Sequence, residues 1–242
     1  MRLVWAHARA ELLELLRYPS FSVPALLFPA LLFLFFGVPS EGSDEAILMV
    51  SYAAFGVLGV ALFQFGVGVA SERSSPWQVY LRTLPAPAYA RFAARLLAAA
   101  VFALGSAGAV VAVALTLTSA ELGAGQWLRV GVALAYGTVP FGLLGLAIGY
   151  WLTPKGAVPV ANILFLGLAF LGGLWTGAAS LPSTVESFSP LLPTRQWGEI
   201  VWAPAVGQAW ELWPWLGLAA YAAAFGALAS WGYRRDEGTR YR

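Results

Sequence analysis

The chain has 242 residues and a formal net charge of +2, and 60% of its residues are hydrophobic while only 11% are charged. A soluble domain carries about a quarter charged residues, so this composition excludes a water-soluble globule. The absence of cysteine excludes disulfides, iron–sulfur clusters and thiolate zinc sites. We therefore expect an all-α integral membrane protein, because helices satisfy their own backbone polar groups within a bilayer.

Long apolar runs predict six transmembrane helices, since about 20 apolar residues span a bilayer as a helix. In chain order the expected spans are Phe21–Val38, Ala46–Ala70, Phe92–Thr118, Leu128–Leu152, Ala157–Ala178 and Leu212–Gly232. We expect a single membrane domain of residues 1–242. It consists of an N-terminal segment of residues 1–19, a membrane region of residues 21–232 and a tail of residues 233–242.

The distribution of basic residues orients these spans, because cytoplasmic loops are enriched in arginine and lysine. Of the 14 basic residues, only Arg129 and Arg195 fall in loops on one side. All the others lie before the first span, between spans two and three, between spans four and five, or after span six. Both termini are therefore expected in the cytoplasm.

Before the first span, residues 2–18 predict an amphipathic helix that lies along the cytoplasmic membrane surface, in contact with membrane lipid. Its apolar face, at helical spacing, consists of Trp5, Ala8, Leu12, Leu15 and Leu16. Arg2, Arg9 and Glu11 lie off that face. Residues 18–20 then turn the chain into the bilayer.

The cytoplasmic loop of residues 71–91 contains a second short helix, predicted over Pro76–Leu84. Ser75 is placed as its N-cap, Pro76 at the first helical position, and Gln78 completes an S-x-x-Q capping box. The helix must end before the prolines that follow, and at roughly 13 Å it is too short to span a bilayer. Its apolar face consists of Trp77, Tyr80, Leu81 and Leu84.

Two interpretations of this short helix remain open from the residues alone. A rigid, capped amphipathic helix on the cytoplasmic side is suited to docking on a partner protein. The same apolar face would also suit an interfacial helix that anchors spans two and three among the lipid headgroups. Gln78 and Arg82 lie on another face of the helix.

Between spans five and six, residues 180–204 combine four prolines with several large apolar side chains. We expect short, proline-broken helices at the outer interface, with the tryptophans at headgroup depth. An ordinary extracellular loop is the alternative.

Few residues here carry reactive chemistry. His7 is the single histidine and lies outside the predicted spans, and acidic residues lie outside or at the edge of the spans. Neither a nucleophile–base pair, a metal site nor a proton relay is predicted, so enzymatic activity is not expected. The only lysine, Lys155, is not part of a G-x-x-x-x-G-K-[ST] motif, so the chain does not bind ATP through a P-loop. The dispersed basic residues argue against nucleic acid as a partner.

Two motifs connect the chain to a known family. E-R-S-S-P-W-Q-V-Y-L-R-T-L-P-A-P-A-Y, residues 72–89, resembles the cytoplasmic loop of type-2 ABC transporter permeases, where an E-R pair leads into a short helix ending near T-L-P. L-P-S-T-V-E-S-F-S-P-L-L-P-T-R-Q-W-G-E-I, residues 181–200, resembles the family's segment before the final span. The resemblance covers essentially the whole chain. Residues 74–76, S-S-P, stand where many members have a Gly-Thr or Gly-Trp pair.

The resemblance implies the permease subunit of an ATP-driven exporter in a prokaryotic plasma membrane. It implies a second permease copy or paralogue, and two cytoplasmic ATP-binding cassette subunits that hold ATP and Mg²⁺. The short helix would be the coupling helix that rests on the ATPase, and the outer segment would form re-entrant helices. Glu72 and Arg73 would link the coupling helix to the N-terminal helix. The implied ATPase-coupling residues are Glu72, Arg73, Pro76, Trp77, Tyr80, Leu81, Arg82 and Leu84.

The competing hypothesis is a non-transporting membrane anchor or receptor that uses the same helix to dock a cytoplasmic regulator. For a transporter, the shortage of charge within the spans points to an apolar or amphiphilic cargo, such as a lipid or drug.

Polar and aromatic residues within the spans give candidates for the substrate path. Gln64 in span two and Asn162 in span five are expected at similar depth, about 10 Å from the cytoplasmic boundary. They either line the path or form an interhelical hydrogen bond. Phe170 and Trp175 are candidates for contact with an apolar substrate, with packing as the alternative.

Two G-x-x-x-G patterns, Gly145/Gly149 and Gly173/Gly177, are suited to close helix contact. Because the resemblance implies that span five faces the dimer partner, Gly173 and Gly177 are the expected dimer contact.

Overall fold

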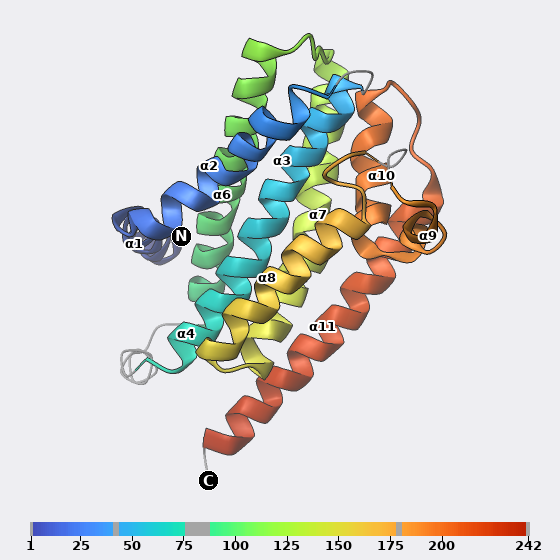
Figure 1. The fold of residues 1–242 in the computed structure, drawn as a ribbon. Helices are drawn as coiled ribbons and strands as arrows, with labels where there is room; N and C mark the ends of the chain where they lie inside the picture. The colour runs from blue at the N-terminus through green and yellow to red at the C-terminus, as the bar shows by residue number, and fades with distance from the viewer. Residues whose placement is uncertain (1, 41–43, 76–87, 178–180, 241–242) are drawn as a thin grey trace.

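The computed structural model describes residues 2–40, 44–75, 88–177 and 181–240. Within these ranges every regular element is helical, and the long helices pack side by side in one bundle (Figure 1). Five helices are each long and apolar enough to cross a bilayer, and a bent N-terminal pair raises the number to as many as six. The prediction of an all-α protein with multiple membrane spans is confirmed.

Successive long helices run in alternating directions (Figure 1). The α-helices of the described residues are, in chain order, α1 (Arg2–Arg17), α2 (Pro19–Leu32), α3 (Glu45–Leu62), α4 (Val69–Arg73), α6 (Ala88–Leu117), α7 (Ala124–Trp151), α8 (Pro154–Leu171), α9 (Ser183–Glu186), α10 (Pro193–Ala205) and α11 (Leu212–Arg240). The π-helical segments η1 (Phe33–Gly37) and η2 (Phe63–Gly68) continue α2 and α3, and the 3₁₀ turn η4 (Ser189–Leu191) precedes α10. We call the end of the bundle that holds α4 and the C-terminus the basal end (Figure 1).

The central helix of the bundle is α3 with its continuation through η2 and α4. This span runs 29 residues from Glu45 to Arg73, and 83% of its most apolar stretch is buried. It packs against α2, α6, α7, α8 and α10, which explains why it is apolar all round rather than along one face. Asp44 caps its start, since Oδ1 accepts the backbone N–H of Ala46 at 2.9 Å and of Ile47 at 3.2 Å.

Two glycines let α7 approach the central helix closely. A Cβ at Gly145 would lie 2.6 Å from the carbonyl oxygen of Ala61, and a Cβ at Gly149 would lie 2.8 Å from that of Phe65. Both distances are shorter than van der Waals contact, so the two backbones meet only because these side chains are absent. The predicted role of Gly145 and Gly149 in close helix contact is confirmed.

The fifth span is shorter than predicted, because α8 ends at Leu171, about two turns early. Gly173 takes a φ of 77°, which favours glycine. Its N–H donates to the carbonyl of Phe170 at 3.0 Å, and the N–H of Leu174 donates to that of Ala169 at 2.9 Å. These two bonds form a Schellman motif, which stops the helix inside an apolar run.

Short helices broken by prolines are found between α8 and α11, as expected, but α10 is buried in the bundle. Trp197 is fully buried, and its Nε1 donates to the carbonyl of Ala133 at 2.8 Å. Trp202 is also buried, and its Nε1 donates to Ser51 Oγ at 2.6 Å. The indole N–H groups therefore find their partners inside the protein, and the headgroup depth of these tryptophans stays a prediction.

Three side chains of α10 each pack over a glycine in a different part of the bundle. Thr194, Gln196 and Trp197 occupy the space that a Cβ would take at Gly172 after α8, Gly217 in α11 and Gly137 in α7, respectively. A second bond supports this seat, because Thr194 Oγ1 donates to the carbonyl of Leu168 at 2.6 Å. The helix α10 therefore packs between α7, the end of α8 and α11.

The two ends of the chain also differ from expectation in detail. α11 continues as a helix to Arg240, so most of the expected tail of residues 233–242 extends the last span. At the other end, α1 meets the following helical segment at 69° and packs on α6. Its predicted apolar face is divided: Ala8 is buried against the bundle, whereas Trp5 and Leu16 are 69% and 54% exposed.

Replacing Gly149 with alanine is expected to destabilise the protein by about 1–3 kcal/mol, because the new methyl group overlaps the backbone of the central helix. Gly131→Ala in the same helix is the control, since a Cβ there has nothing within 4 Å. Thermal unfolding of both variants in detergent measures the difference. Equal unfolding temperatures for the two would contradict the close-packing role.

Candidate functional site

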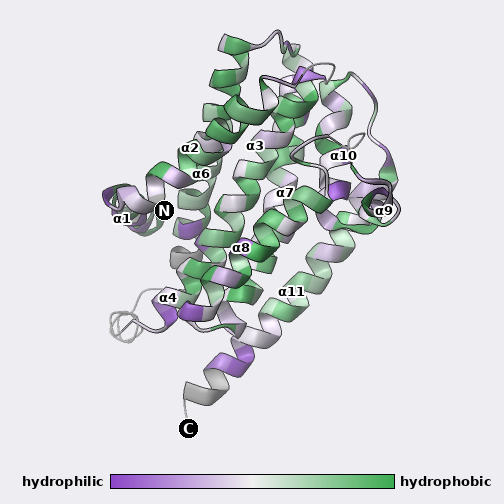
Figure 2. Ribbon diagram, viewed as in Figure 1, coloured by the Kyte–Doolittle hydropathy of each residue, from purple (hydrophilic) through white to green (hydrophobic). Residues whose placement is uncertain are grey.

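Charged side chains from four helices meet at the basal end. This set, called the basal junction below, consists of Glu11 in α1, Glu72 and Arg73 in α4, Arg95 in α6 and Asp236 in α11. Figure 2 shows hydrophilic residues gathered on α4 and on the lower part of α11. Because Glu72 and Arg73 are consecutive, their side chains leave the helix about 100° apart and reach different neighbours.

Glu72 connects the central helix to α6 and, through it, to α1. Arg95 Nη2 donates to Glu72 Oε1, and Arg95 Nε donates to Glu11 Oε1 at 3.2 Å. The Arg95 side chain is only 14% exposed, so two carboxylates flank one shielded guanidinium. Glu72 thus reaches the N-terminal helix through Arg95, which was not among the predicted coupling residues.

Arg73 connects the central helix to α7 and α11. Its Nη2 donates to Asp236 Oδ1 at 2.7 Å, and its Nη1 donates to the carbonyl of Gly149. The guanidinium carbon also lies 5.6 Å from the ring centroid of Tyr150. These contacts of Arg73 run to α7 and α11, and its expected link to the N-terminal helix stays a prediction.

Further contacts hold the C-terminal turns of α11 against the end of α7. A Cβ at Gly232 would lie 2.7 Å from the indole of Trp151, so the helices approach closely there. Trp151 Nε1 donates to the carbonyl of Leu228 at 3.0 Å, and the guanidinium of Arg235 lies 5.3 Å from a Trp151 ring centroid. Asp236 is therefore presented to Arg73 by a packed helix.

Burial raises the pKa of Glu11 above its usual value, although the positive charge and hydrogen bond of Arg95 act in the opposite direction. The neighbouring carboxylates of Glu72 and Glu14 raise this pKa further. Protonation of Glu11 would leave Arg95 paired with Glu72. Across the part of the chain that the structure describes, no three histidine, aspartate or glutamate side chains group to hold a metal ion.

The predicted coupling helix over Pro76–Leu84 lies outside the described residues. The residues affected are Pro76, Trp77, Tyr80, Leu81, Arg82 and Leu84. The described chain reaches Ser75, whose N–H donates to the carbonyl of Glu72 at 2.9 Å, and resumes at Ala88. The basal junction therefore lies directly before this loop.

Gln64 is placed in η2 and is only 6% exposed. Its amide nitrogen and oxygen are both buried without a hydrogen-bond partner among the described residues. A buried amide without partners is costly in an apolar bundle. π-Helical segments within α-helices often mark functional positions, which keeps Gln64 a candidate for contact with cargo.

Asn162 lies on an exposed face of α8, where its Nδ2 donates to the carbonyl of Val158 one turn earlier at 3.1 Å. The interhelical hydrogen bond considered for Gln64 and Asn162 is therefore not formed. The exposed neighbours on the same face are Val158, Ile163, Leu166 and Phe170. An amide on such a face is costly when it meets lipid, so this face is a candidate for burial against another chain.

Phe170 and Trp175 lie together at the end of α8, with ring centroids 6.2 Å apart. Trp175 also packs edge-on against Phe55 of α3 at 6.1 Å, and its carbonyl accepts the Tyr52 hydroxyl at 3.1 Å. Phe170 is 38% exposed, so it remains accessible from the α8 face. This supports packing as the main role of Trp175 and leaves Phe170 as the accessible member.

Gly173 and Gly177 do not form a helical G-x-x-x-G surface. Both follow the end of α8 and have φ angles of 77° and 76°. The expectation that they form a helical pair is therefore wrong, because α8 ends before them, and their contact with a dimer partner stays a prediction.

Apolar spanning helices, with a charged junction beneath the central one, give the architecture of a multi-span membrane protein. The ABC-2 type transporter family model matches residues 2–204. The chain is also 26% identical over 208 residues to the Bacillus subtilis (strain 168) protein titled "Putative transport permease YvfS", and the match covers 84% of this chain and 85% of that protein.

The chain therefore belongs to the ABC-2 type transporter family. It is a transmembrane permease, and membership of this family implies association with ATP-binding cassette subunits.

Replacing Glu11 with glutamine is expected to stabilise the protein at about pH 7.5 and to have little effect at about pH 4.5. A carboxyl whose pKa is raised on folding contributes stability below its unfolded value of about 4.3, and this contribution is lost as pH rises through the folded value. Thermal unfolding at the two pH values measures the change, with the exposed Glu14→Gln as control. A larger gain at the lower pH would reverse the assigned direction.

Replacing Gln64 with leucine is expected to stabilise the protein by about 1–3 kcal/mol, because it removes a buried amide without partners. Gln126→Leu is the matched control and should destabilise, since the Gln126 amide nitrogen donates to the carbonyls of Pro204 and Ala205 at 2.9 and 3.1 Å. Chemical unfolding of both variants gives the sign. A loss of stability in the Gln64 variant would show that its amide has a partner.

Proposed function

We propose that this chain is the permease subunit of an ATP-driven exporter, energised through the loop of residues 71–91. The observation that carries the proposal is the basal junction. It ties the start of that loop to α1 and α6 through Glu72, and to α7 and α11 through Arg73. Because the side chains of Arg73 and Arg95 are only 20% and 14% exposed, their ion pairs are costly to break singly, and a force on the loop would reach the four helices together.

ATP and Mg²⁺ belong, in this proposal, to a separate cytoplasmic ATP-binding cassette subunit. Family membership supports such a partner, and the sequence offers no P-loop lysine of its own. The coupling helix Pro76–Leu84 would rest in the ATPase and receive its motion when ATP binds. The membrane would be a prokaryotic plasma membrane, with both termini on the ATPase side.

A second permease copy or paralogue would pack on the exposed face of α8. The face that carries Asn162 replaces Gly173 and Gly177 as the proposed dimer contact. Burial there would remove the Asn162 amide from lipid and offer it a partner on the other chain. The cargo would pass between the two permeases.

An apolar or amphiphilic cargo fits the side chains on offer. Phe170 is accessible beside α8, and Gln64 supplies a single unpaired amide within η2. Apolar walls with few polar groups are typical of sites for small hydrophobic ligands. A lipid or drug molecule is therefore the proposed cargo class.

Replacing Trp77 and Leu81 together with aspartate is expected to release the ATPase subunit. Two charges on the apolar face of the coupling helix would lower recovery of the partner by about tenfold or more, as for loss of a binding hot spot. Affinity purification of the tagged chain in gentle detergent, followed by mass spectrometry, measures the bound partner.

Lys155→Asp is the control, since Lys155 begins α8 in a different basal turn. Recovery of the ATPase should be unchanged in that variant. Retention of a P-loop partner by the Trp77/Leu81 variant would overturn the coupling role. A partner without a P-loop would favour the anchor or receptor hypothesis.

A further inference from the structure

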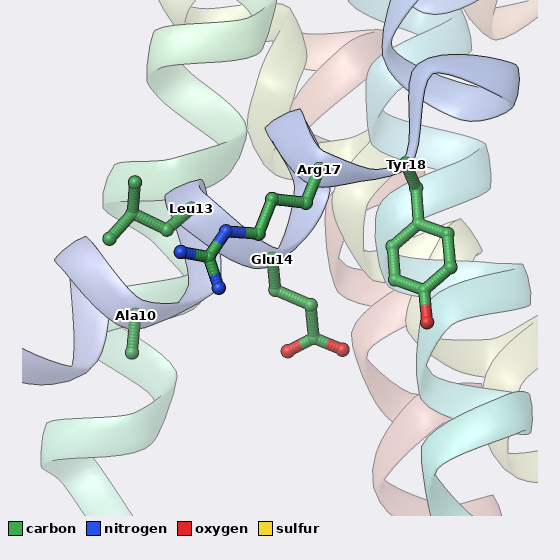
Figure 3. Close-up of a pocket in the computed structure, with 5 residues that line it drawn as sticks. All are labelled: Ala10, Leu13, Glu14, Arg17 and Tyr18. Atoms are coloured by element: carbon green, nitrogen blue, oxygen red, sulfur yellow. The ribbon is translucent and has the colours of Figure 1, made fainter.

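The elbow between α1 and α2 borders an open hollow of about 610 Å³. Its lining residues, drawn in Figure 3, are Ala10, Leu13, Glu14, Arg17 and Tyr18. The hollow exists because α1 leaves the line of the following helix by 69°, with Tyr18 at the bend. Glu11 of the basal junction lies in the same stretch of α1, between Ala10 and Leu13, but none of the five lining residues belongs to that junction.

Two opposite charges line this hollow, those of Glu14 and Arg17. Glu14 and Arg17 are three residues apart, so they share one side of α1. Neither forms an ion pair or hydrogen bond with any residue in the described ranges, and both side chains are exposed. In Figure 3 the Arg17 guanidinium turns back along α1, whereas the Glu14 carboxylate projects on the Tyr18 side.

The position of the hollow matches the headgroup layer of a bilayer. The segment Ser22–Gly37 is bent by 69° from α1 and is apolar enough to form a membrane span together with it, which favours a bend at the membrane surface. Leu13 and Leu16 are 41% and 54% exposed, and Tyr18 is 62% exposed. Exposed leucines with a tyrosine beside charges are typical of the membrane interface.

We infer that this elbow binds a phospholipid headgroup that carries both a phosphate and a primary ammonium. Arg17 would donate to the phosphate oxygens, and Glu14 would accept from the ammonium. Leu13 and Tyr18 would contact the glycerol and the start of the acyl chains. The inference depends on the membrane fold alone, so it holds or fails independently of the proposed ATPase coupling.

The charge pattern distinguishes among lipids. A purely anionic headgroup such as phosphatidylglycerol would satisfy Arg17 but bring negative charge to Glu14. A quaternary ammonium, as in phosphatidylcholine, has no N–H to donate to the carboxylate. Phosphatidylethanolamine presents both groups and is the expected ligand class.

The test measures thermal unfolding of the detergent-purified full chain with added phosphatidylethanolamine, phosphatidylglycerol or phosphatidylcholine. At roughly a hundredfold excess over the dissociation constant, phosphatidylethanolamine should raise the unfolding temperature by about 5 °C or more, and more than the other two lipids. Equal shifts with all three lipids, or a larger shift with phosphatidylglycerol, would overturn the inference.

Single substitutions in the elbow test the contributions of Arg17 and Glu14 one at a time. Arg17→Gln should abolish the shift with phosphatidylethanolamine, whereas Glu14→Gln should make the shifts with phosphatidylethanolamine and phosphatidylglycerol equal. Arg9→Gln, an exposed arginine of the same helix outside the hollow, is the control and should behave as wild type. Unfolding temperatures without added lipid show whether each variant is folded. An unchanged lipid preference in both elbow variants would contradict the site.

Discussion

The close contact of α7 with the backbone of the central helix is the constraint on which the rest of the structure depends. Gly149 allows this approach because it has no side chain, and its carbonyl then accepts a hydrogen bond from Arg73. Arg73 in turn holds Asp236 of α11. The charge pairing at the base of the bundle therefore depends on the close packing of α7 against the central helix.

The consecutive residues Glu72 and Arg73 contact helices on opposite sides of the bundle. Glu72 faces α1 and α6, and Arg73 faces α7 and α11, so the short α4 has a charged contact on each side. Shielded ion pairs contribute little net stability against apolar alternatives, but they are costly to break singly. Their value here lies in fixing the position from which the following loop departs.

Much of the fold was predictable because apolar length and helix caps are local properties. The membrane class, the approximate spans and the Gly145/Gly149 contact follow from such patterns. The end of α8 was missed because the apolar run continues past the Schellman turn at Gly173. Asp236 and Arg95 were not predicted as partners of Arg73 and Glu72, since these pairs join residues 163 and 23 positions apart. Burial of Trp197 likewise depends on the distant Gly137, which no local pattern reveals.

The seat of α10 has a consequence for the order in which the chain assembles during synthesis. Thr194 and Trp197 fit over glycines of α8 and α7, which leave the ribosome first, but Gln196 needs Gly217 of α11, which is made afterwards. The contacts of α10 are therefore complete only when α11 is in place, and a chain interrupted before α11 would leave Gln196 without its contact at Gly217.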